Sequence, residues 1–524
     1  MLTRRDLLAR AGALGVAGMA TGASAQDHSG HGGAATLSVY EQDEFDPEVL
    51  AAPESGPLPI PELVDARDHD GQLHLSAAAS RHRFAPNFPT SASYGYNGSF
   101  LGPTLRLRRG ESVEISVENR LPEMTTAHWH GLLIPAWLDG GPHNAIEPGE
   151  TWAPVLEIDQ GEATCWYHAH PHHATGWQVH MGLAGMIYVE DGTGERLGLP
   201  RDYGVDDIPL VLQDRMFTEA GEQFFRPYPR ERILGLRGDM MVVNGAISPH
   251  AAVPAGLVRL RLLNGANARN FHLHFSDGRE FHVVATDGGY IRAPAPVSEL
   301  TISPGERFEI VVDFSDGAEV ELRTHDDEVE GHGRRMGRLT TRSPSSGNLS
   351  SQAGTMVHFR VDPELPVADN LLSERLVSVP QADARPVFTR RSVALEMWPE
   401  HGGTLPGELG GRGQGPAMSI NGKRFDMDRI DFAPTRGSVE LWEIHSHLMP
   451  HPFHVHGAFF RIVSLDGARP PAHLDGWKDT VLVEEHAEIA IAFDQPATRD
   501  YPFMFHCHIL EHEDGDMMGQ FITV

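Results

Sequence analysis

Cysteine is scarce in this chain. Only Cys165 and Cys507 occur among its 524 residues, too few for the disulfide framework that stabilises many exported proteins. The fold must therefore be held together by packing. A chain of this length also exceeds one hydrophobic core, and it is long enough for roughly three or four domains.

Cationic residues are also under-represented. The chain has 42 Lys and Arg against 72 Asp and Glu, which gives a formal net charge of −30. A surface of this charge repels nucleic acid and anionic lipid and attracts cations. We therefore expect no nucleic-acid partner.

Long hydrophobic runs are missing at the N-terminus. The apolar stretch at residues 9–20 is rich in Gly and Ala, and it is shorter than the roughly 20 apolar residues that cross a bilayer. It follows Arg4 and Arg5 and precedes a small-residue cleavage site at 23–25, which is the order of a twin-arginine export signal. The alternative is a fraying amphipathic N-terminus. We therefore expect residues 1–25 to be a signal peptide and the exported protein to be periplasmic without a membrane anchor.

Short alternating runs dominate the rest of the chain. Apolar residues recur at every second position in runs such as 105–107 and 113–117, between Gly, Pro and Asn turns, which is typical of β-sandwiches. A Gly turn, an alternating strand pair and an aromatic and histidine segment follow one another three times, in residues 104–131, 244–275 and 421–457. The sequence therefore predicts an all-β chain of three similar domains.

Linkers between these domains are predicted from composition. Proline- and acid-rich stretches lie near 193–208 and 362–386. We therefore expect a flexible lead-in over residues 26–57, followed by domains over residues 58–195, 205–365 and 385–524.

The 31 histidines of the chain concentrate in four short motifs. These motifs are His128-Trp129-His130-Gly131, His168-Ala169-His170, His451-Pro452-Phe453-His454-Val455-His456-Gly457 and His506-Cys507-His508. Side chains alternate between the two faces of a strand, so the two histidines of each His-x-His pair share a face. Eight imidazoles can therefore converge on one site, from His128, His130, His168, His170, His454, His456, His506 and His508.

Two residues of the same motifs fall at the other set of alternate positions, so their side chains should lie on the opposite face of the strand. Cys507 and His451 should point away from the eight histidines toward a second site, which His512 and Met517 can complete. Two imidazoles, a thiolate and a thioether are the ligand set of a blue copper centre. The peptide that joins Cys507 to its histidine neighbours offers a short covalent route for electrons between the two sites.

The other histidines and Cys165 have simpler interpretations. A lone His-x-His pair is commonly structural, and we interpret His272 and His274 in this way because no partner motif accompanies them. Cys165 has no second cysteine to pair with and is predicted to be a buried free thiol. Two further groups, which could hold an extra copper but which we place at the surface, are His172, His173 and His180, and His445 and His447.

The four motifs together resemble those of the multicopper oxidases, specifically the three-domain bacterial copper-efflux oxidases and bacterial laccases. The resemblance covers essentially the whole chain after the signal, and its most specific segments are residues 163–168, 181–185, 476–481 and 506–518. It implies three consecutive cupredoxin-like Greek-key β-sandwich domains. It also implies four copper ions, namely one type 1, one type 2 and two type 3.

The resemblance also implies a role for each ligand. It assigns type 1 copper to His451, Cys507, His512 and Met517, and type 2 copper to His128 and His454. It assigns one type 3 copper to His130, His168 and His508, and the other to His170, His456 and His506. Asp139 and Glu513 occupy positions that deliver protons in the family, with solvated surface acids as the alternative interpretation. One departure is Asp516, which stands directly before Met517 where the family often has Gly.

The resemblance implies that a small reducing substrate is oxidised while dioxygen is reduced to water. Copper-efflux oxidases carry a methionine-rich insert in the third domain, which suits Cu(I). Residues 400–415 of this chain contain no methionine. We therefore expect a monomeric, laccase-like oxidase of phenols or aromatic amines, with oxidation of Cu(I) in copper tolerance as the alternative.

Other classes of protein are disfavoured. Some proteins of this fold are cell-division or scaffold proteins that have lost their copper ligands, whereas every ligand position is occupied here. A copper-storage protein needs no His-Cys-His relay. A two-domain copper nitrite reductase would lack the third repeat and the paired His-x-His motifs in one chain.

Overall fold

The computed structural model describes residues 53–225, 229–325, 354–378, 387–397 and 418–524. The predicted export signal and most of the predicted lead-in lie outside these residues. Within the described ranges, no helix is long and apolar enough to cross a membrane.

The first group of strands forms two sheets with a shared core. One sheet has the order β3-β2-β5-β6, with β7 also paired to β5, and the other has the order β1-β4-β9-β8. Buried and less buried residues alternate along β5, as expected for a strand with one face in a core. The strands are β1 (Leu63–Asp65), β2 (Gln72–Arg83), β3 (Thr90–Tyr96), β4 (Thr104–Arg108), β5 (Ser112–Asn119), β6 (Thr151–Trp152), β7 (Val155–Glu157), β8 (Ala163–His168) and β9 (Ala184–Glu190).

The second group of strands also forms two sheets. Their orders are β12-β11-β10-β14-β19-β16-β17 and β13-β21-β20-β15-β18. These strands enclose a large core of aliphatic and phenylalanine side chains. The strands are β10 (Asp207–Arg215), β11 (Met240–Val243), β12 (Ala246–Ile247), β13 (His250–Val253), β14 (Leu257–Asn264), β15 (Phe271–Phe275), β16 (Phe281–Thr286), β17 (Gly289–Val297), β18 (Glu299–Ile302), β19 (Arg307–Asp313), β20 (Val320–Thr324) and β21 (Thr355–Val361).

The third group repeats the arrangement near the C-terminus. Its sheets have the orders β23-β22-β24-β28-β26 and β27-β25-β29-β30, around a separate core that includes Trp442 and Cys507. The strands are β22 (Val387–Glu396), β23 (Ser419–Ile420), β24 (Ser438–Ser446), β25 (His451–Val455), β26 (Phe459–Leu465), β27 (Thr480–Val483), β28 (His486–Phe493), β29 (Phe503–Cys507) and β30 (Met518–Phe521).

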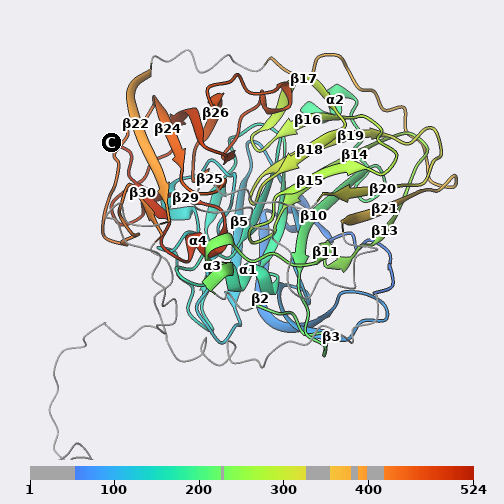
Figure 1. Ribbon diagram of the computed structural model, residues 1–524, viewed down its shortest axis with the longest axis horizontal. Helices are drawn as coiled ribbons and strands as arrows, with labels where there is room; N and C mark the ends of the chain where they lie inside the picture. The colour runs from blue at the N-terminus through green and yellow to red at the C-terminus, as the bar shows by residue number, and fades with distance from the viewer. Residues whose placement is uncertain (1–52, 226–228, 326–353, 379–386, 398–417) are drawn as a thin grey trace, which may run out of the picture. The chain divides into compact units, whose positions relative to one another are not determined.

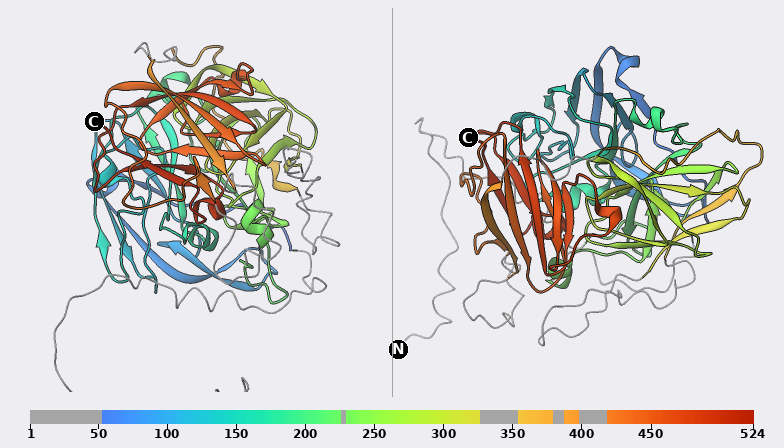
Figure 2. Two further views of the ribbon diagram at one scale, coloured as in Figure 1. Left: turned by 60° about the vertical axis from the view of Figure 1, so that its left-hand side comes forward. Right: turned by 90° about the horizontal axis from the view of Figure 1, so that it is seen from above.

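Helices in the described residues are short and lie between strands (Figure 1). They are α1 (Thr175–Met181), α2 (Thr193–Leu197), α3 (Pro229–Leu234) and α4 (Leu510–Glu513), with 3₁₀ turns η2 (Ala66–His69), η3 (Ala136–Leu138) and η4 (Ala472–Leu474). The strands fall into three colour groups, blue to cyan, green to yellow, and orange to red (Figure 2). The predicted all-β, cupredoxin-like architecture is confirmed, while the predicted domain boundaries stay predictions.

Candidate metal centre

Strand pairing brings the four histidine motifs together. His454 on β25 lies opposite His506 on β29 in an antiparallel pair, and His128 forms an isolated bridge with His168 at the end of β8. The segment of His128 and His130 is therefore not a regular strand, although the alternation of its side chains predicts one. The bridge is enough to keep both side chains on the expected side.

All eight histidines of the His-x-His pairs are buried together. The rings of His130 and His454 stack with centroids 3.7 Å apart, and those of His128 and His456 with centroids 3.9 Å apart. Potential ligand atoms within 4.8 Å of one another include three sets of histidines, two of which share His130. The sets are His130, His168 and His508; His170, His456 and His506; and His128, His130 and His454. The first two are the triplets that the resemblance assigns to the type 3 pair.

Backbone carbonyls orient several rings. His128 Nδ1 lies 2.9 Å from the carbonyl oxygen of Asp139, His168 Nδ1 2.9 Å from that of Ala169, and His454 Nδ1 2.9 Å from that of Asp479. A carbonyl only accepts, so each Nδ1 must carry the proton and donate it. Each Nε2 is then a bare acceptor, and these three Nε2 atoms are buried without a hydrogen-bond partner. A cation is the natural partner for buried acceptors of this kind.

Three further acceptor nitrogens within the histidine cluster face one another directly, which is stronger evidence for a bound cation. His506 Nε2 lies 3.2 Å from His170 Nε2 and 3.1 Å from His456 Nε2. The Nδ1 atoms of these rings face acceptors, since His506 Nδ1 is 3.0 Å from the Cys507 carbonyl and His456 Nδ1 is 2.7 Å from Asp139 Oδ2. Three lone pairs that converge in this way repel one another unless a cation lies between them. The residues present therefore fit a metal.

Burial keeps these imidazoles neutral. Loss of solvent, followed by the neighbouring histidines, holds the pKa of His170, His456 and His506 well below the usual value. A neutral imidazole has the free lone pair that a metal requires. The cluster is therefore prepared for ligation at neutral pH.

The second predicted site forms on the other face of β29. Potential ligand atoms of His451, Cys507 and His512 lie within 4.8 Å of one another, and Cys507 Sγ is 3.5 Å from His512 Nδ1. Met517 is fully buried, and its backbone carbonyl accepts a hydrogen bond from the Cys507 amide at 3.2 Å. Burial raises the pKa of the Cys507 thiol well above its usual value, so its ionisation requires a cation such as a thiophilic metal.

The second group of strands contributes to this site through α3. His512 Nε2 donates to the carbonyl of Ile233 at 2.9 Å, which leaves Nδ1 directed at Cys507. Ser446 Oγ lies 2.6 Å from His451 Nδ1. Hydrogen bonds of this kind fix the orientation of metal-ligating rings.

The two predicted proton-delivering carboxyls lie beside the histidine cluster. Asp139 Oδ2 is 2.7 Å from His456 Nδ1 and 3.3 Å from His128 Nδ1. Glu513 lies between His170 Nδ1, at 3.2 Å, and His506 Nδ1, at 3.4 Å. Both carboxyls are buried, which excludes solvated surface acids. Burial, followed by Asp514, raises the pKa of Glu513 well above its usual value.

A third buried carboxylate, Asp479, was missed as a functional residue. Its Oδ1 lies 3.0 Å from His130 Nε2, and Arg307 donates to both of its oxygens at 2.7 and 2.6 Å. Burial opposes ionisation, but Arg307 and His130 outweigh it and hold the pKa of Asp479 well below its usual value. His130 therefore directs Nδ1, which has no hydrogen-bond partner, at the cluster.

The ion pair of Asp479 extends into a larger buried network. Asp287 lies 3.7 Å from Arg307 and 3.1 Å from Lys478, and Lys478 lies 3.0 Å from Glu306. Residues 476–481 were recognised as a family-like segment, yet nothing in the sequence indicates that Asp287 and Arg307, far away along the chain, are their partners.

Several simpler predictions can also be judged. Cys165 is a buried free thiol, as predicted. The surface assignment of His180 is wrong, because this residue is buried within α1, and its ring centroid lies 5.0 Å from that of Phe225. His172 and His173 are partly exposed and lie beside Asp516.

Comparison with known proteins agrees with this site. Three protein-family models, each described as multicopper oxidase, match residues 79–194, 235–320 and 403–524 of the sequence. The chain belongs to the multicopper oxidase family, which is a family of copper-dependent oxidoreductases that also has relatives named for cell division.

Individual relatives include proteins of two kinds. The chain is 38% identical to cell division protein FtsP of Yersinia pestis over 89% of its length and 92% of that protein. It is 33% identical to multicopper oxidase mco of Staphylococcus haemolyticus over 88% of its length and 91% of that protein. A solved laccase-like multicopper oxidase, CueO from Ochrobactrum sp., shares 46% identity with a TM-score of 0.79, covering 89% of this chain and all of that one.

Proposed function

We propose that this protein is a laccase-like multicopper oxidase with four copper ions, which oxidises phenolic or aromatic donors one electron at a time and reduces dioxygen to water. The observation that carries the proposal is the pair of linked sites. One is a cluster of eight buried imidazoles with converging acceptors, and the other is the group of His451, Cys507 and His512. When bound, copper would supply the one-electron steps and the binding of dioxygen.

The ligand set favours an oxidase over a cell-division protein such as the FtsP relatives. A protein that acts only as a scaffold has no need for buried acceptors that repel one another without a cation. Here all twelve predicted ligands are buried, and the two triplets of the histidine cluster are intact. A role in cell division is therefore not required to account for the site.

The residues of the chain divide the work between them. Cys507 connects the two sites because His506 and His508 are its covalent neighbours. Asp139 and Glu513 hold buried carboxyls against the outer nitrogens of four cluster histidines, where they can orient the rings and pass protons inward. Oxygen reduction consumes protons as well as electrons, so such groups are needed in a site that excludes bulk water.

The choice of donor rests on a likeness and on composition. The similar Ochrobactrum enzyme has oxidase activity toward lignin model compounds and lignosulfonate. Together with the absence of methionine from residues 400–415, this favours aromatic donors over Cu(I). The same proposal includes a periplasmic location, export by the twin-arginine pathway and a monomeric state.

Oxygen uptake with separate donors tests the proposal. We expect the copper-loaded protein to consume oxygen rapidly with 2,6-dimethoxyphenol and to be blue at rest. Uptake with Cu(I) but not with the phenol would instead assign the protein to copper detoxification. A colourless protein with no uptake from either donor would contradict the oxidase assignment.

A further inference from the structure

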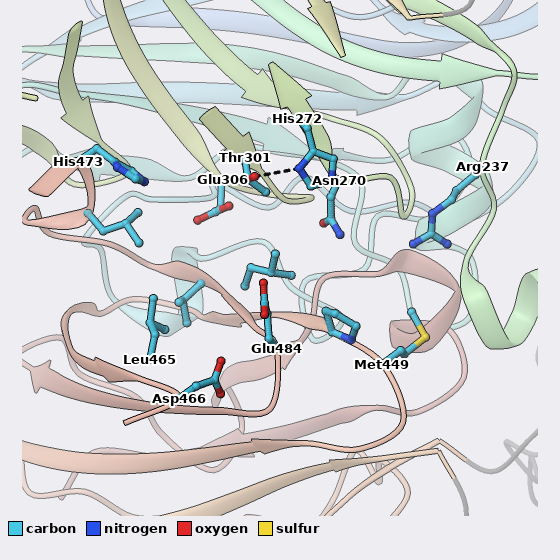
Figure 3. Close-up of a pocket in the computed structure, with 14 residues that line it drawn as sticks. Arg237, Asn270, His272, Thr301, Glu306, Met449, Leu465, Asp466, His473 and Glu484 are labelled. Carbon is cyan, nitrogen blue, oxygen red and sulfur yellow. Dashed lines mark hydrogen bonds between the residues drawn. The ribbon is translucent and has the colours of Figure 1, made fainter. Parts of the chain in front are cut away.

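The His-x-His pair of the second group of strands has two members with different surroundings. His272 lines a cavity of about 380 Å³, and its Nδ1 lies 2.9 Å from Thr301 Oγ1 (Figure 3). His274, two residues further along β15, does not line this cavity. The hydrogen bond to Thr301 accounts for His272 as a structural residue, as the sequence predicts, but it gives no role to His274.

Three side chains that can bind a metal meet at His274. His274 on β15 lies opposite Glu299 on β18 in an antiparallel pair, so both side chains project from the same face of the sheet. The ring of His325, which follows β20, stacks on the ring of His274 with the centroids 3.9 Å apart and the planes at 13°. His325 Nε2 also lies 3.4 Å from Glu299 Oε2. Two imidazoles and a carboxylate are therefore gathered at one point of the sheet.

The separation of His325 Nε2 from Glu299 Oε2 suits a shared metal ion better than a hydrogen bond. A charge-assisted hydrogen bond between a nitrogen and a carboxylate is usually about 2.7–2.9 Å long, which is shorter than the 3.4 Å between these atoms. Two ligands of one tetrahedral zinc ion, each about 2.1 Å from the metal, lie about 3.4 Å from each other. The two atoms are therefore placed as neighbouring ligands of one ion.

The contact of His274 with the backbone leaves the correct nitrogen for a metal. His274 Nδ1 lies 3.3 Å from the carbonyl oxygen of His272, and a carbonyl only accepts, so Nδ1 carries the proton. Nε2 then presents its lone pair, which is the usual arrangement of a metal-ligating histidine. The same arrangement orients His128, His168 and His454 in the histidine cluster.

Glu299 keeps its charge available for a cation. Arg323 lies opposite His274 across β15 and β20, but its Nε donates to Glu321 at 2.6 Å. Within the residues that the structure describes, Glu299 makes no ion pair with an arginine or a lysine. The carboxylate beside His358 is that same Glu321, so this other pair of a histidine and a glutamate is already satisfied by an arginine.

We propose that His274, Glu299 and His325 form a binding site for a divalent transition-metal ion, distinct from the histidine cluster and from the Cys507 site. Imidazole and carboxylate ligands suit zinc and copper(II), and two histidines with one glutamate leave a fourth position for water. The side chains of His325 and Glu299 are 56% and 52% exposed, so an ion can reach them from solvent. The net charge of −30 favours the approach of cations. The site does not depend on the proposed oxidase function.

Zinc titration of the copper-loaded protein tests this site, because copper then fills the other two sites and zinc adds no colour of its own. Isothermal titration calorimetry measures the affinity and the number of zinc ions bound. We expect His274→Gln and Glu299→Gln each to weaken zinc binding at this site at least tenfold. His282→Gln is the matched control, since His282 lies in the same group of strands beside a single carboxylate, that of Glu280 at 4.0 Å, and it should leave zinc binding unchanged.

Equal zinc binding by the unsubstituted protein and by folded His274→Gln and Glu299→Gln variants would overturn the assignment, because the zinc would then be bound elsewhere. The absence of zinc binding by the unsubstituted protein would overturn it as well. Circular dichroism establishes that each variant is folded. Anomalous diffraction at the zinc edge from zinc-soaked crystals needs no variant. A peak between His274, Glu299 and His325 is expected, and peaks confined to other histidines would refute the site.

Discussion

At the scale of single residues, the histidine cluster depends on side chains that do not bind metal. Asp479 is the clearest case, because it receives two hydrogen bonds from Arg307 and lies 3.0 Å from His130 Nε2. With Nε2 engaged, His130 can ligate only through Nδ1. Asp479 is therefore a positioning residue.

Replacing Asp479 with Asn tests this role. The substitution leaves the buried guanidinium of Arg307 without its closest full counter-charge, and breaking a buried ion pair costs about 3–5 kcal/mol. We expect Asp479→Asn to lower the free energy of unfolding by an amount of this order and to weaken the near-ultraviolet absorption of the type 3 pair, while the blue band persists. Asp475→Asn, at a half-exposed ion pair on the same segment, is the control and should alter neither. An unchanged type 3 absorption would show that His130 needs no such support.

At the scale of elements, strand β2 is held to the second group of strands by a histidine. His82 Nε2 lies 2.8 Å from the carbonyl of Gly245, and its Nδ1 lies 2.9 Å from Ser99 Oγ. Burial lowers the pKa of His82 below its ordinary value of 6.5. The neutral ring is therefore part of the contact between these elements.

This shift makes stability depend on pH. Below about pH 6.5 the unfolded chain takes up a proton at position 82 that the folded chain resists, so the free energy of unfolding falls as pH drops, by up to about 1.4 kcal/mol per pH unit. In denaturant titrations between pH 5 and 8, His82→Asn should lose this part of the pH dependence. His74→Asn, on the same strand but half exposed, should keep it. Parallel pH profiles for both variants would refute the assignment.

At the scale of the whole molecule, the second group of strands supplies none of the predicted copper ligands. It nevertheless shapes the histidine cluster. Gly305, with φ of +85°, shows this, because a Cβ built there would lie 2.7 Å from the ring of His508. Arg307 and Asp287 add further contacts to the histidine cluster from this part of the chain, and the Ile233 carbonyl contributes to the Cys507 site. The histidine cluster is therefore enclosed by all three groups of strands.

The substitution Gly305→Ala tests whether the second group of strands must leave space for His508. The added methyl group must displace His508, so we expect lower copper content and a weaker type 3 absorption. Gly317→Ala is the matched control, since Gly317 also has a positive φ, of +71°, but open space where its Cβ would be. Both variants carry a similar backbone strain of about 1–2 kcal/mol, because an L-residue is disfavoured at positive φ. Equal copper content in the two proteins would argue against a role for Gly305.

The sequence predicted the ligands better than their surroundings. The alternation of side chains along a strand correctly predicts that Cys507 lies on the opposite face from its neighbours His506 and His508. Asp479 could not be assigned a role in this way, since its partner Arg307 lies 172 residues away and no local pattern links them. His180 was placed wrongly because the exposure of a residue in a short helix depends on what packs against that helix.

The copper content of the purified, loaded protein, measured together with its electron paramagnetic resonance spectrum, tests the two linked copper sites most directly. We expect four coppers per chain, of which two are detected by resonance, one with the narrow hyperfine splitting of a thiolate-bound type 1 site and one with the wider splitting of type 2. The remaining two should be silent as a coupled pair. One copper per chain, or none, would contradict the assignment as a four-copper oxidase and would favour a scaffold role instead.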